Sequence, residues 1–276
     1  MDIIKVALQE DGIDFDVTTI ALGIKDSKTD FCLIANEDCI LSGIDAFLKV
    51  FKSIDKNIKV KFNFKNGDYV SSKSIVANLS GPSNSILKGE RVSLNLISHL
   101  SGISTLTNSL VERVKNTHVK ILDTRKTTPG YRVMERLAVI HGGGHNHRFN
   151  LSDRILIKDN HIAEVGGIST ALTLANSYLK KSKKKYLIEI EVSNKKELFE
   201  AIKFKPDIIM FDNWSPNNIK KFISVVPKSI STEASGSINM SNIRQYASTG
   251  VDYISTSYMV KHKKWIDFSL EVDCTL

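Results

Sequence analysis

The sequence predicts an α/β fold: a (β/α) barrel, incomplete or irregular, together with an N-terminal α+β sandwich domain. The first observation behind this prediction is a series of short apolar runs from residue 119 onward, each ending in polar or charged residues. The runs are VKILDTRK, RILIKDN, YLIEIEV, DIIMFDN, SISTEASG and DYISTS. The second observation is that helical patterns lie between several of these runs. Strands that alternate with helices predict a parallel sheet, and such a sheet closed on itself is an α/β barrel.

The helical patterns carry start and stop signals. Asn194 precedes LFEAI, with Glu197 three residues later, and Ser215 is followed by Pro216 before NNIKKFISVV. Asparagine and serine side chains accept hydrogen bonds from the first N–H groups of a helix, and proline suits the first helical position. Gly250 marks the end of a third helix, because glycine accepts the left-handed conformation in which helices end.

The first hundred residues follow a different pattern. A helical opening, IIKVALQED, is followed by the strand-like pieces DFCLIAN, NIKVKFNF and SIVANLSG, which NGD and GP turns separate. Residues 88–114 then space apolar side chains as in one or two buried helices, which Gly102 is expected to break or kink. We expect an N-terminal α+β domain over residues 1–103, a catalytic barrel over 104–265, and a C-terminal segment, 266–276, that returns to the N-terminal domain.

Composition limits the class of protein. The chain has 276 residues, 42% of them hydrophobic and 25% charged, and a net charge of +8, which suits nucleic acids and small acidic ligands alike. It has no aromatic RNA-binding motif and no basic region leading into heptads, so we expect no nucleic-acid partner. No apolar run reaches the roughly 20 residues of a membrane span, and the start lacks a signal peptide, so we expect no membrane partner. Three cysteines, Cys32, Cys39 and Cys274, lack CxxC spacing and indicate inert thiols in a reducing cytoplasm.

Polar side chains follow six of the predicted strands, where barrel enzymes place their chemistry. The first five strands contribute Asp123, Thr124, Arg125, Lys158, Asp159, Glu191, Asp212, Asn213, Glu233 and Ser235, and the sixth run, DYISTS, ends in serine and threonine. The two-residue period of a strand puts Glu189 and Glu191 on the same side, with Glu189 one layer deeper. We expect a carboxylate at that depth to have a partner cation.

A cationic cluster spans DTRKTTPGYR, residues 123–132, and HGGGHNHR, residues 141–148. A metal held by His141, His145 and His147 is one interpretation, but Arg148 and its neighbouring cations would oppose the charge of a metal. A structural role is favoured for His141. The remaining interpretation is a site for a multivalent anion, in which glycines 142–144 let backbone N–H groups approach. The chain has neither GxxxxGK[ST] nor GxGxxG, so neither nucleotide motif is present.

Long motifs in the same order resemble the quinolinate phosphoribosyltransferases, also called nicotinate-nucleotide pyrophosphorylases (carboxylating), of the type II phosphoribosyltransferase family. The resemblance runs from ALQEDGIDFDVTT through ERVSLNLISHLSGISTLT, ILDTRKTTPGYR, GGGHNHRFNLSDRILIKDNHI, IEIEV, DIIMFDNWSP and STEASGSI to TGVDYIS. It covers nearly the whole chain. It implies an α/β barrel packed on an N-terminal α+β domain, and a homodimer or higher homo-oligomer in which Arg91 of the partner subunit completes the active site.

The resemblance also implies the site residues. The family's quinolinate-binding and catalytic cations correspond to Arg125, Lys126, His147, Arg148 and Lys158, and Thr124 lies beside them in the same motif. The acidic residues near ribose and magnesium correspond to Glu191 and Asp212, and the phosphate-binding positions correspond to Ser235, Gly236 and Ser257. Of these residues we assign catalysis to Lys126, Lys158, Glu191 and Asp212.

The implied reaction transfers the phosphoribosyl group of phosphoribosyl pyrophosphate (PRPP) to quinolinate with decarboxylation. Its products are nicotinate mononucleotide, pyrophosphate and carbon dioxide, in de novo NAD synthesis. Mg²⁺ is the implied cofactor, carried with PRPP and held by Glu191 and Asp212 directly or through PRPP. The alternative is a related branch associated with molybdenum transport, which has another acceptor. Ser237, Ser257 and Lys261 depart from the family pattern near the expected phosphate loop.

Overall fold

The computed structural model describes residues 2–24 and 27–272, which form two compact units. The N-terminal unit comprises Met1–Asn108, Thr127–Gly143 and Met259–Leu276. The barrel unit comprises Ser109–Lys126 and Gly144–Tyr258. Each unit is described by itself below. The domain boundaries expected at 103/104 and 265/266 stay predictions.

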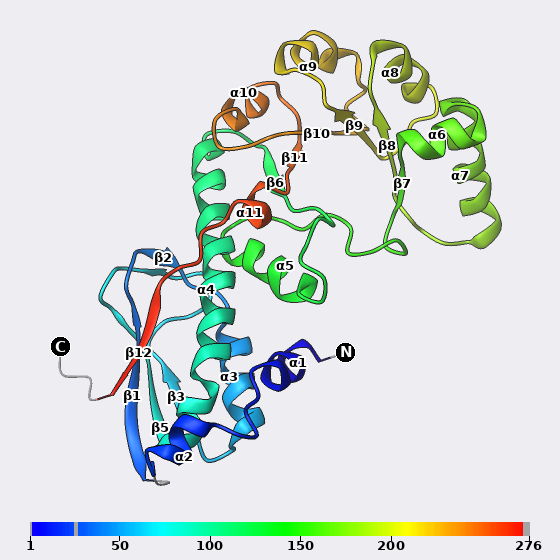
Figure 1. Cartoon of the computed structure of the whole chain (residues 1–276). Helices are drawn as coiled ribbons and strands as arrows, with labels where there is room; N and C mark the ends of the chain where they lie inside the picture. Colours follow the sequence, from blue (N-terminus) through cyan, green and yellow to red (C-terminus); the bar gives the residue numbers. More distant parts are fainter. Residues whose placement is uncertain (1, 25–26, 273–276) are drawn as a thin grey trace. The chain divides into compact units, whose positions relative to one another are not determined.

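The N-terminal unit is built on an antiparallel sheet in the order β12-β1-β5-β3 (Figure 1). The bounds are β12 (Phe268–Val272), β1 (Lys28–Ala35), β5 (Ile75–Pro82) and β3 (Lys59–Phe62), with a short pair of β2 (Cys39–Ile40) and β4 (Tyr69–Val70). The strands predicted from DFCLIAN, NIKVKFNF and SIVANLSG are therefore confirmed as β1, β3 and β5. The last strand, β12, adds residues from the end of the chain to the edge of this sheet.

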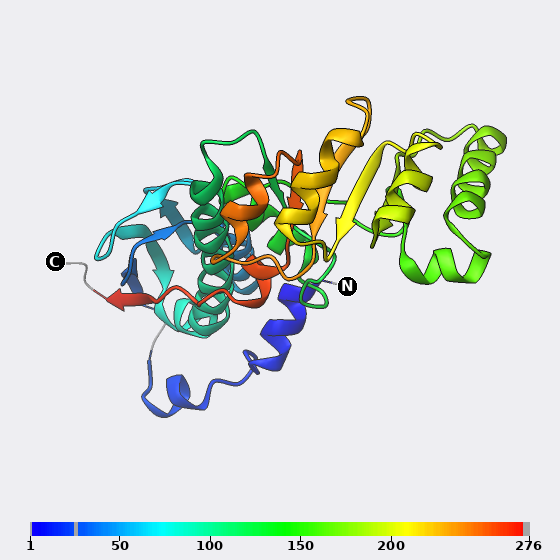
Figure 2. The same cartoon turned by 90° about the horizontal axis from the view of Figure 1, so that it is seen from above.

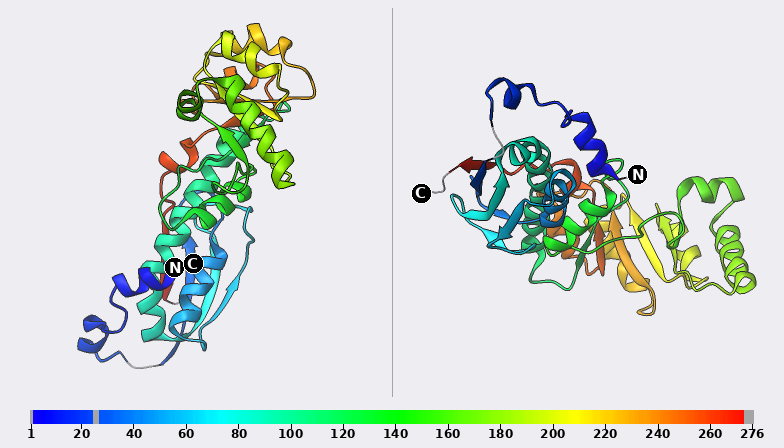
Figure 3. Two further views of the ribbon diagram at one scale, coloured as in Figure 1. Left: turned by 90° about the vertical axis from the view of Figure 1, so that its right-hand side faces the viewer. Right: turned by 90° about the horizontal axis from the view of Figure 1, so that it is seen from below.

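The helices of this unit are α1 (Ile3–Glu10), α2 (Val17–Ala21), α3 (Ile44–Ile54), α4 (Ser83–Val114) and α5 (Arg132–His141), while the short α11 (Tyr258–Lys261) begins at the last residue of the barrel unit. Phe47 and Phe51 of α3 and Ile97 of α4 share one buried cluster with Phe31 and Leu33 of β1. Figure 3 shows α3 and α4 lying along the strands. This arrangement is the α+β domain that the sequence predicts.

Helix α4 is continuous from Ser83 to Val114, so the expected interruption at Gly102 is wrong. A Cβ atom on Gly102 would lie 2.0 Å from the backbone oxygen of Lys264. Glycine is present because another segment of the same unit approaches the helix backbone, and only a residue without a side chain leaves that space.

The barrel unit contains six parallel strands in the order β6-β11-β10-β9-β8-β7. They are β6 (Lys120–Leu122), β7 (Ile155–Ile157), β8 (Ile188–Val192), β9 (Ile208–Asp212), β10 (Ser231–Ser235) and β11 (Tyr253–Ser255). The order is cyclic along the chain, and within the described residues no ladder joins β6 to β7. The prediction of an incomplete α/β barrel is confirmed, with one strand for each of the six apolar runs.

Helices connect these strands: α6 (Asp159–Val165), α7 (Ile168–Ser182), α8 (Lys195–Ile202), α9 (Pro216–Phe222), the 3-10 turn η1 (Ile223–Val225) and α10 (Ile243–Ala247). Figure 2 shows α8 and α9 beside the strands that precede them. The predicted starts are confirmed: Asn194 accepts the N–H of Glu197 at 3.1 Å, and Ser215 accepts that of Asn218 at 3.3 Å. Gly250 follows α10 at φ +90°, as its stop signal predicts.

The cysteines and the lengths of the helices can be compared with the expectations from composition. Cys39 is buried with a free thiol, as predicted, but Cys32 is disulfide-bonded, so the prediction of inert thiols is wrong for Cys32. Cys274 lies outside the described residues. None of the helices in residues 2–24 and 27–272 has the length and apolar character needed to cross a membrane.

Candidate active site

The carboxyl ends of the barrel strands meet at one rim. Ser235, the last residue of β10, lies in register with Asp212 on β9 and with Ser255 on β11, and Ser255 lies in register with Leu122 on β6. The residues that follow Leu122 include the cations of the DTRKT motif. Strand pairing therefore brings the ends of β6, β9, β10 and β11 together, as parallel strands require.

Two carboxylates and a lysine lie at the ends of β7, β8 and β9. Lys158 Nζ donates a hydrogen bond to Glu191 Oε1, and Asn213 Nδ2 donates to Asp212 Oδ2 at 2.9 Å. Burial raises the pKa of Glu191, and the negative charge of Asp212 adds to that effect, although the bond to Lys158 opposes it. Glu191 and Asp212 are thus close enough to repel each other. A cationic substrate group or an ion held between them would relieve that repulsion.

Two guanidinium groups lie close together in the same unit. Burial lowers the pKa of Arg148, and the positive charge of Arg125 is the next cause. Arg125 Nε is buried without a hydrogen-bond partner within the part of the chain that the structure describes. Because a buried donor without a partner costs free energy, this arrangement indicates a place for an anion. Thr124 Oγ1 accepts the N–H of Lys126 at 3.1 Å and fixes the loop that carries both Arg125 and the exposed Lys126.

The loop after β10 has an unusual backbone. Gly236 has φ +104°, and a Cβ atom there would lie 2.2 Å from Asn213 Oδ1. Ser237 follows with φ +52°, a left-handed conformation that costs a side-chain-bearing residue free energy. Ser237 thus stands where the family has a second glycine, and its backbone adopts a conformation that glycine usually adopts. Ser257 is half-buried two residues after β11.

A cluster of charged side chains lies one layer below the rim (we call it the deep cluster: His147, Arg154, Glu189 and Glu233). Glu189 is fully buried, and its two oxygens accept from His147 Nε2 at 3.1 Å and from Arg154 Nη1 at 2.7 Å. The predicted partner cation of Glu189 is therefore confirmed as Arg154. Glu233 Oε1 lies 3.6 Å from His147 Nε2.

The two carboxyl groups of the deep cluster have opposite pKa shifts. Burial opposes ionisation of Glu189, but the hydrogen bond of His147 and the charge of Arg154 outweigh burial and lower its pKa. Burial and the charge of Glu189 raise the pKa of Glu233 to about 8. Near neutral pH, Glu189 is therefore a carboxylate, whereas Glu233 is mostly the neutral acid.

The imidazole of His147 is engaged on both sides. Its Nδ1 accepts the backbone N–H of Arg148 at 2.8 Å, so this nitrogen carries a lone pair and the ring proton lies on Nε2, facing Glu189. The backbone N–H of His147 donates to Asp123 Oδ1 at 2.7 Å. The negative charge of Glu189 favours a protonated ring. Because Nδ1 accepts a hydrogen bond, however, it carries no proton, and the ring in this geometry is the neutral tautomer. Direct substrate contact by His147 stays a prediction.

Arg154 was absent from the predicted site, and Glu233, predicted as a strand-end residue without an assigned role, lies buried below the rim. Glu233 had a usable signal, because in SISTEASG it stands two residues before Ser235, as Glu189 stands two residues before Glu191. The sequence of β7 contained no signal for Arg154, because Arg154 precedes this strand and contacts Glu189 on the neighbouring strand β8. Its pairing is visible only once the strands are assembled.

The glycines and histidines of the HGGGHNHR motif have separate tasks. His141 Nδ1 is hydrogen-bonded to Ser42 Oγ at 2.8 Å, which confirms its structural role.

The glycines of this motif pack closely and have partners for their N–H groups. A Cβ atom on Gly142 would lie 2.4 Å from the backbone oxygen of Ser104. The N–H groups of Gly142 and Gly143 donate to the backbone oxygens of Ala138 and Ile140 at the end of α5. The expectation that Gly142 and Gly143 offer free N–H groups to an anion is therefore wrong. His145 is exposed.

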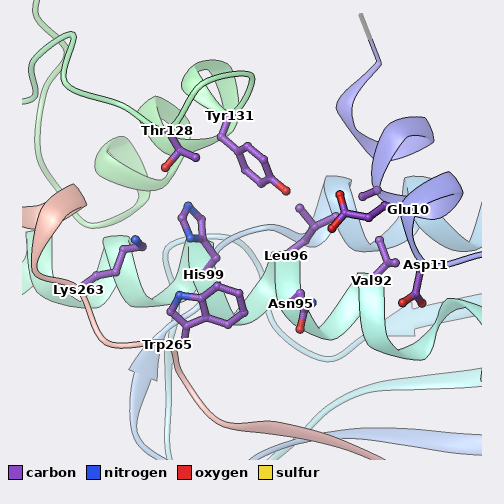
Figure 4. Close-up of a pocket in the computed structure, with 11 residues that line it drawn as sticks. Glu10, Asp11, Val92, Asn95, Leu96, His99, Thr128, Tyr131, Lys263 and Trp265 are labelled. Atoms are coloured by element: carbon purple, nitrogen blue, oxygen red, sulfur yellow. The ribbon is translucent and has the colours of Figure 1, made fainter.

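Arg91 lies exposed on α4 in the N-terminal unit. One turn later the same helix lines a cavity of about 490 Å³ (Figure 4). In it, His99 Nε2 is hydrogen-bonded to Glu135 Oε1 at 2.9 Å and packs edge-on against Tyr131 and Trp265. These contacts join α4 to α5 and to the segment that carries Trp265.

Two sets of side chains could hold a metal ion. Among the described residues, one set consists of His147, Glu189 and Glu233, whose potential metal-binding atoms lie within 4.8 Å of one another. Arg154 already pairs with Glu189 there and opposes a cation. At the rim, Glu191 and Asp212 supply the oxygen ligands that Mg²⁺ prefers, and burial, with the charge of Asp212 as a smaller cause, raises the pKa of Glu191. The chemistry of the rim carboxylates therefore suits a magnesium ion better than that of the deep cluster does.

Comparison with known proteins identifies the family. The model of the quinolinate phosphoribosyl transferase C-terminal domain matches residues 103–271, and that of the N-terminal domain matches residues 16–101. The chain is 40% identical over 240 residues, 87% of its length and 82% of the relative, to a probable nicotinate-nucleotide pyrophosphorylase (carboxylating) of Bacillus subtilis. It is 38% identical over 282 residues, 99% of its length and 96% of the relative, to the protein of the same name in Methanocaldococcus jannaschii.

A solved structure agrees with these sequences. The nicotinate-nucleotide pyrophosphorylase of Francisella tularensis superposes with a TM-score of 0.91 at 39% identity, over 98% of this chain and 95% of that one. Both halves of the chain are thus matched in sequence and in fold. The chain belongs to the quinolinate phosphoribosyltransferase family.

Proposed function

We propose that this protein transfers the phosphoribosyl group of PRPP to quinolinate and releases carbon dioxide and pyrophosphate, giving nicotinate mononucleotide for NAD synthesis. The observation that carries the proposal is the pair Arg125 and Arg148, whose positive charges lie close together beside a buried donor without a partner in the described part of the chain. Two adjacent guanidinium groups need an anion between them. Quinolinate, the acceptor named in the family's description, carries two carboxylates on neighbouring ring carbons.

Quinolinate binding brings two polyanionic substrates together. Arg125 and Arg148 bind the ring carboxylates, with Lys126 as a further cation and the neutral imidazole of His147 as the remaining residue predicted for this site. Each hydrogen bond to a charged group contributes roughly 1.5–3 kcal/mol, so four or five such bonds offset much of the repulsion between quinolinate and PRPP. Lys158, paired with Glu191, lies at the boundary between the two substrates.

PRPP binding uses the opposite side of the rim. Ser235, Gly236 and Ser257 bind the 5-phosphate, where the φ of Gly236 lets the chain turn directly after β10. Mg²⁺ enters as part of the PRPP substrate, and Glu191 and Asp212 orient the ribose hydroxyls and that ion. Ser237 and Ser257 make this half of the site differ from the family pattern.

The reaction follows from the charges at the rim. As pyrophosphate leaves, positive charge grows on the anomeric carbon, and Glu191 and Asp212 stabilise it. The ring nitrogen of quinolinate forms the new bond to that carbon and becomes quaternary. The bond between C2 and its carboxylate then breaks, the electron pair stays on C2, and carbon dioxide leaves. A proton adds to C2, and Lys158 or Lys126 stabilises the charge during this last step.

The active site is proposed to include Arg91 of the partner subunit in a homodimer. Helix α5 supports association, because Val133, Leu137 and Ile140 share one face and are 58%, 47% and 43% exposed. Apolar stripes of this kind are typical of surfaces that another protein covers. A cytoplasmic location and the absence of nucleic-acid and membrane partners stay predictions.

The first experiment measures the products of the purified protein with quinolinate, PRPP and Mg²⁺. We expect pyrophosphate and carbon dioxide in equal amounts. Turnover of nicotinate without carbon dioxide would indicate a different transferase, and turnover of neither acceptor would favour the molybdenum-transport branch.

The second experiment mixes two inactive variants, Arg91→Ala and Arg125→Ala, after unfolding and refolding them together. About a quarter of wild-type activity should return, because half of randomly assembled dimers are hybrids and each hybrid has one intact site. Activity that stays at the level of the separate variants would contradict a site shared between subunits.

A further inference from the structure

Three residues of the deep cluster, His147, Glu189 and Arg154, form a closed ring of hydrogen bonds with Arg148. The backbone N–H of Arg148 donates to His147 Nδ1 at 2.8 Å, and His147 Nε2 donates to Glu189 at 3.1 Å. Arg154 donates to the other oxygen of Glu189 at 2.7 Å, and Arg148 Nη1 donates to the backbone oxygen of Arg154 at 3.4 Å. Glu189 therefore reaches both the backbone and the guanidinium of Arg148, each through one intermediate residue.

We infer that Glu189 is a positioning residue for acceptor binding, which holds the Arg148 guanidinium in place through His147 on one side and Arg154 on the other. The inference rests on the proposed function, in which Arg148 binds a carboxylate of quinolinate. Glu189 itself is fully buried and acts only through its two neighbours.

Arg148 needs such support because its surroundings disfavour its position. It is 5% exposed, and burial and the charges of Arg125 and Arg154 oppose its own charge, while the carboxylates of Glu189 and Glu191 offset them only in part. A guanidinium repelled by two others would turn away from the anion site unless its backbone and its side chain were both fixed. Binding residues held beforehand by their neighbours lose less conformational entropy when the ligand arrives.

The ring also explains why the two buried glutamates differ. Glu189 accepts hydrogen bonds from His147 and Arg154 with its two oxygens, whereas the nearest contact of Glu233 to the ring is 3.6 Å, between its Oε1 and His147 Nε2. Glu233 is near the ring but does not connect any two members of it. It is therefore a matched control: the same residue type, fully buried in the same cluster, without the linking role.

The test compares Glu189→Gln with Glu233→Gln in the full-length protein. Glutamine cannot accept from His147 and Arg154 as a charged group, so Glu189→Gln should raise KM and Kd for quinolinate roughly ten- to hundred-fold, the size of effect seen when a group that orients a ligand-binding residue is removed. KM for PRPP should stay near the wild-type value. Glu233→Gln should leave all three constants close to wild type.

A purely structural role would give a different pattern. Both variants would then lose stability and activity together, or KM for both substrates would rise, and either result overturns the inference. Because Glu189→Gln leaves Arg154 without its counter-ion and could fold poorly, the double variant Glu189→Gln/Arg154→Gln removes both charges at once. It should show the same selective loss of quinolinate affinity, and normal affinity in a folded double variant also overturns the inference. A wild-type protein that turns over no quinolinate would instead refute the proposed function.

Discussion

Glu191 and Glu189 are two residues apart on β8, and each pairs with a cation, yet the two pairs differ in their access to solvent. At the rim, the side chains of Lys158 and Glu191 are 42% and 11% exposed. In the deep cluster, those of Arg154 and Glu189 are 18% and 0% exposed. The exposed pair can exchange its partner for a substrate group at little cost, whereas the buried pair cannot separate without leaving a charge uncompensated. This difference agrees with our proposal that the rim side chains act on the substrates and that the deep cluster positions them.

The largest expected effect is on the stability of the deep cluster. Arg154→Ala should lower the free energy of unfolding by about 3–5 kcal/mol, because it leaves the Glu189 carboxylate buried without its cation. Urea unfolding followed by circular dichroism measures this change. A loss below about 1 kcal/mol, the range of exposed ion pairs, would mean that the deep pair behaves like the rim pair.

Lys158→Ala should show the opposite pattern. We expect kcat to fall about 100- to 1000-fold, the loss typical of removing one electrostatic stabiliser of a transition state. Stability should change by about 1 kcal/mol or less, because the Lys158–Glu191 pair is partly exposed. Steady-state kinetics and urea unfolding on the same preparation test both halves. Near-normal turnover would remove Lys158 from the catalytic residues.

The strands could be predicted from sequence, and so could the need of Glu189 for a partner cation, because the two-residue period of a strand tells which side chains share a face. The same period places Glu189 below Glu191. The identity of that cation could not be predicted, since Arg154 and Glu189 are 35 positions apart and meet only through the pairing of β7 with β8. Gly102 and Gly142 were misinterpreted for the same reason. Each faces a backbone oxygen of a distant segment, and sequence spacing contains no signal for such an approach.

A third prediction distinguishes Glu233 from Glu189 by the pH dependence of the protein's stability. The pKa of Glu233 is raised from 4.5 to about 8, so its contribution to stability is complete below pH 4.5 and is lost as the pH rises to 8. Between pH 5 and 8, wild type should lose up to about 1.4 kcal/mol per pH unit relative to Glu233→Gln. The lowered pKa of Glu189 acts below this window, where its stabilisation is lost as the pH falls. Parallel stability curves for wild type and Glu233→Gln across the window would show that Glu233 is ionised in the fold.

The smallest expected effect concerns the backbone of the rim. Ser237 has φ +52°, so Ser237→Gly should relieve a left-handed strain of about 1–2 kcal/mol and stabilise the protein by about 0.5 kcal/mol after the entropy of the unfolded chain is counted. Gly236→Ala is the matched control and should destabilise, because its Cβ would lie 2.2 Å from Asn213 Oδ1. Thermal unfolding of the two variants gives the comparison. Destabilisation by Ser237→Gly would mean that the serine side chain stabilises this loop.

The most direct test of the division between rim and deep cluster is a crystal structure with quinolinate bound. Our account predicts density for the ligand with its carboxylates against the guanidinium groups of Arg125 and Arg148, while the bonds of Glu189 to His147 and Arg154 stay in place beneath them. Quinolinate bound away from both arginines, or a Glu189 side chain that has left its two partners to reach the ligand, would contradict it.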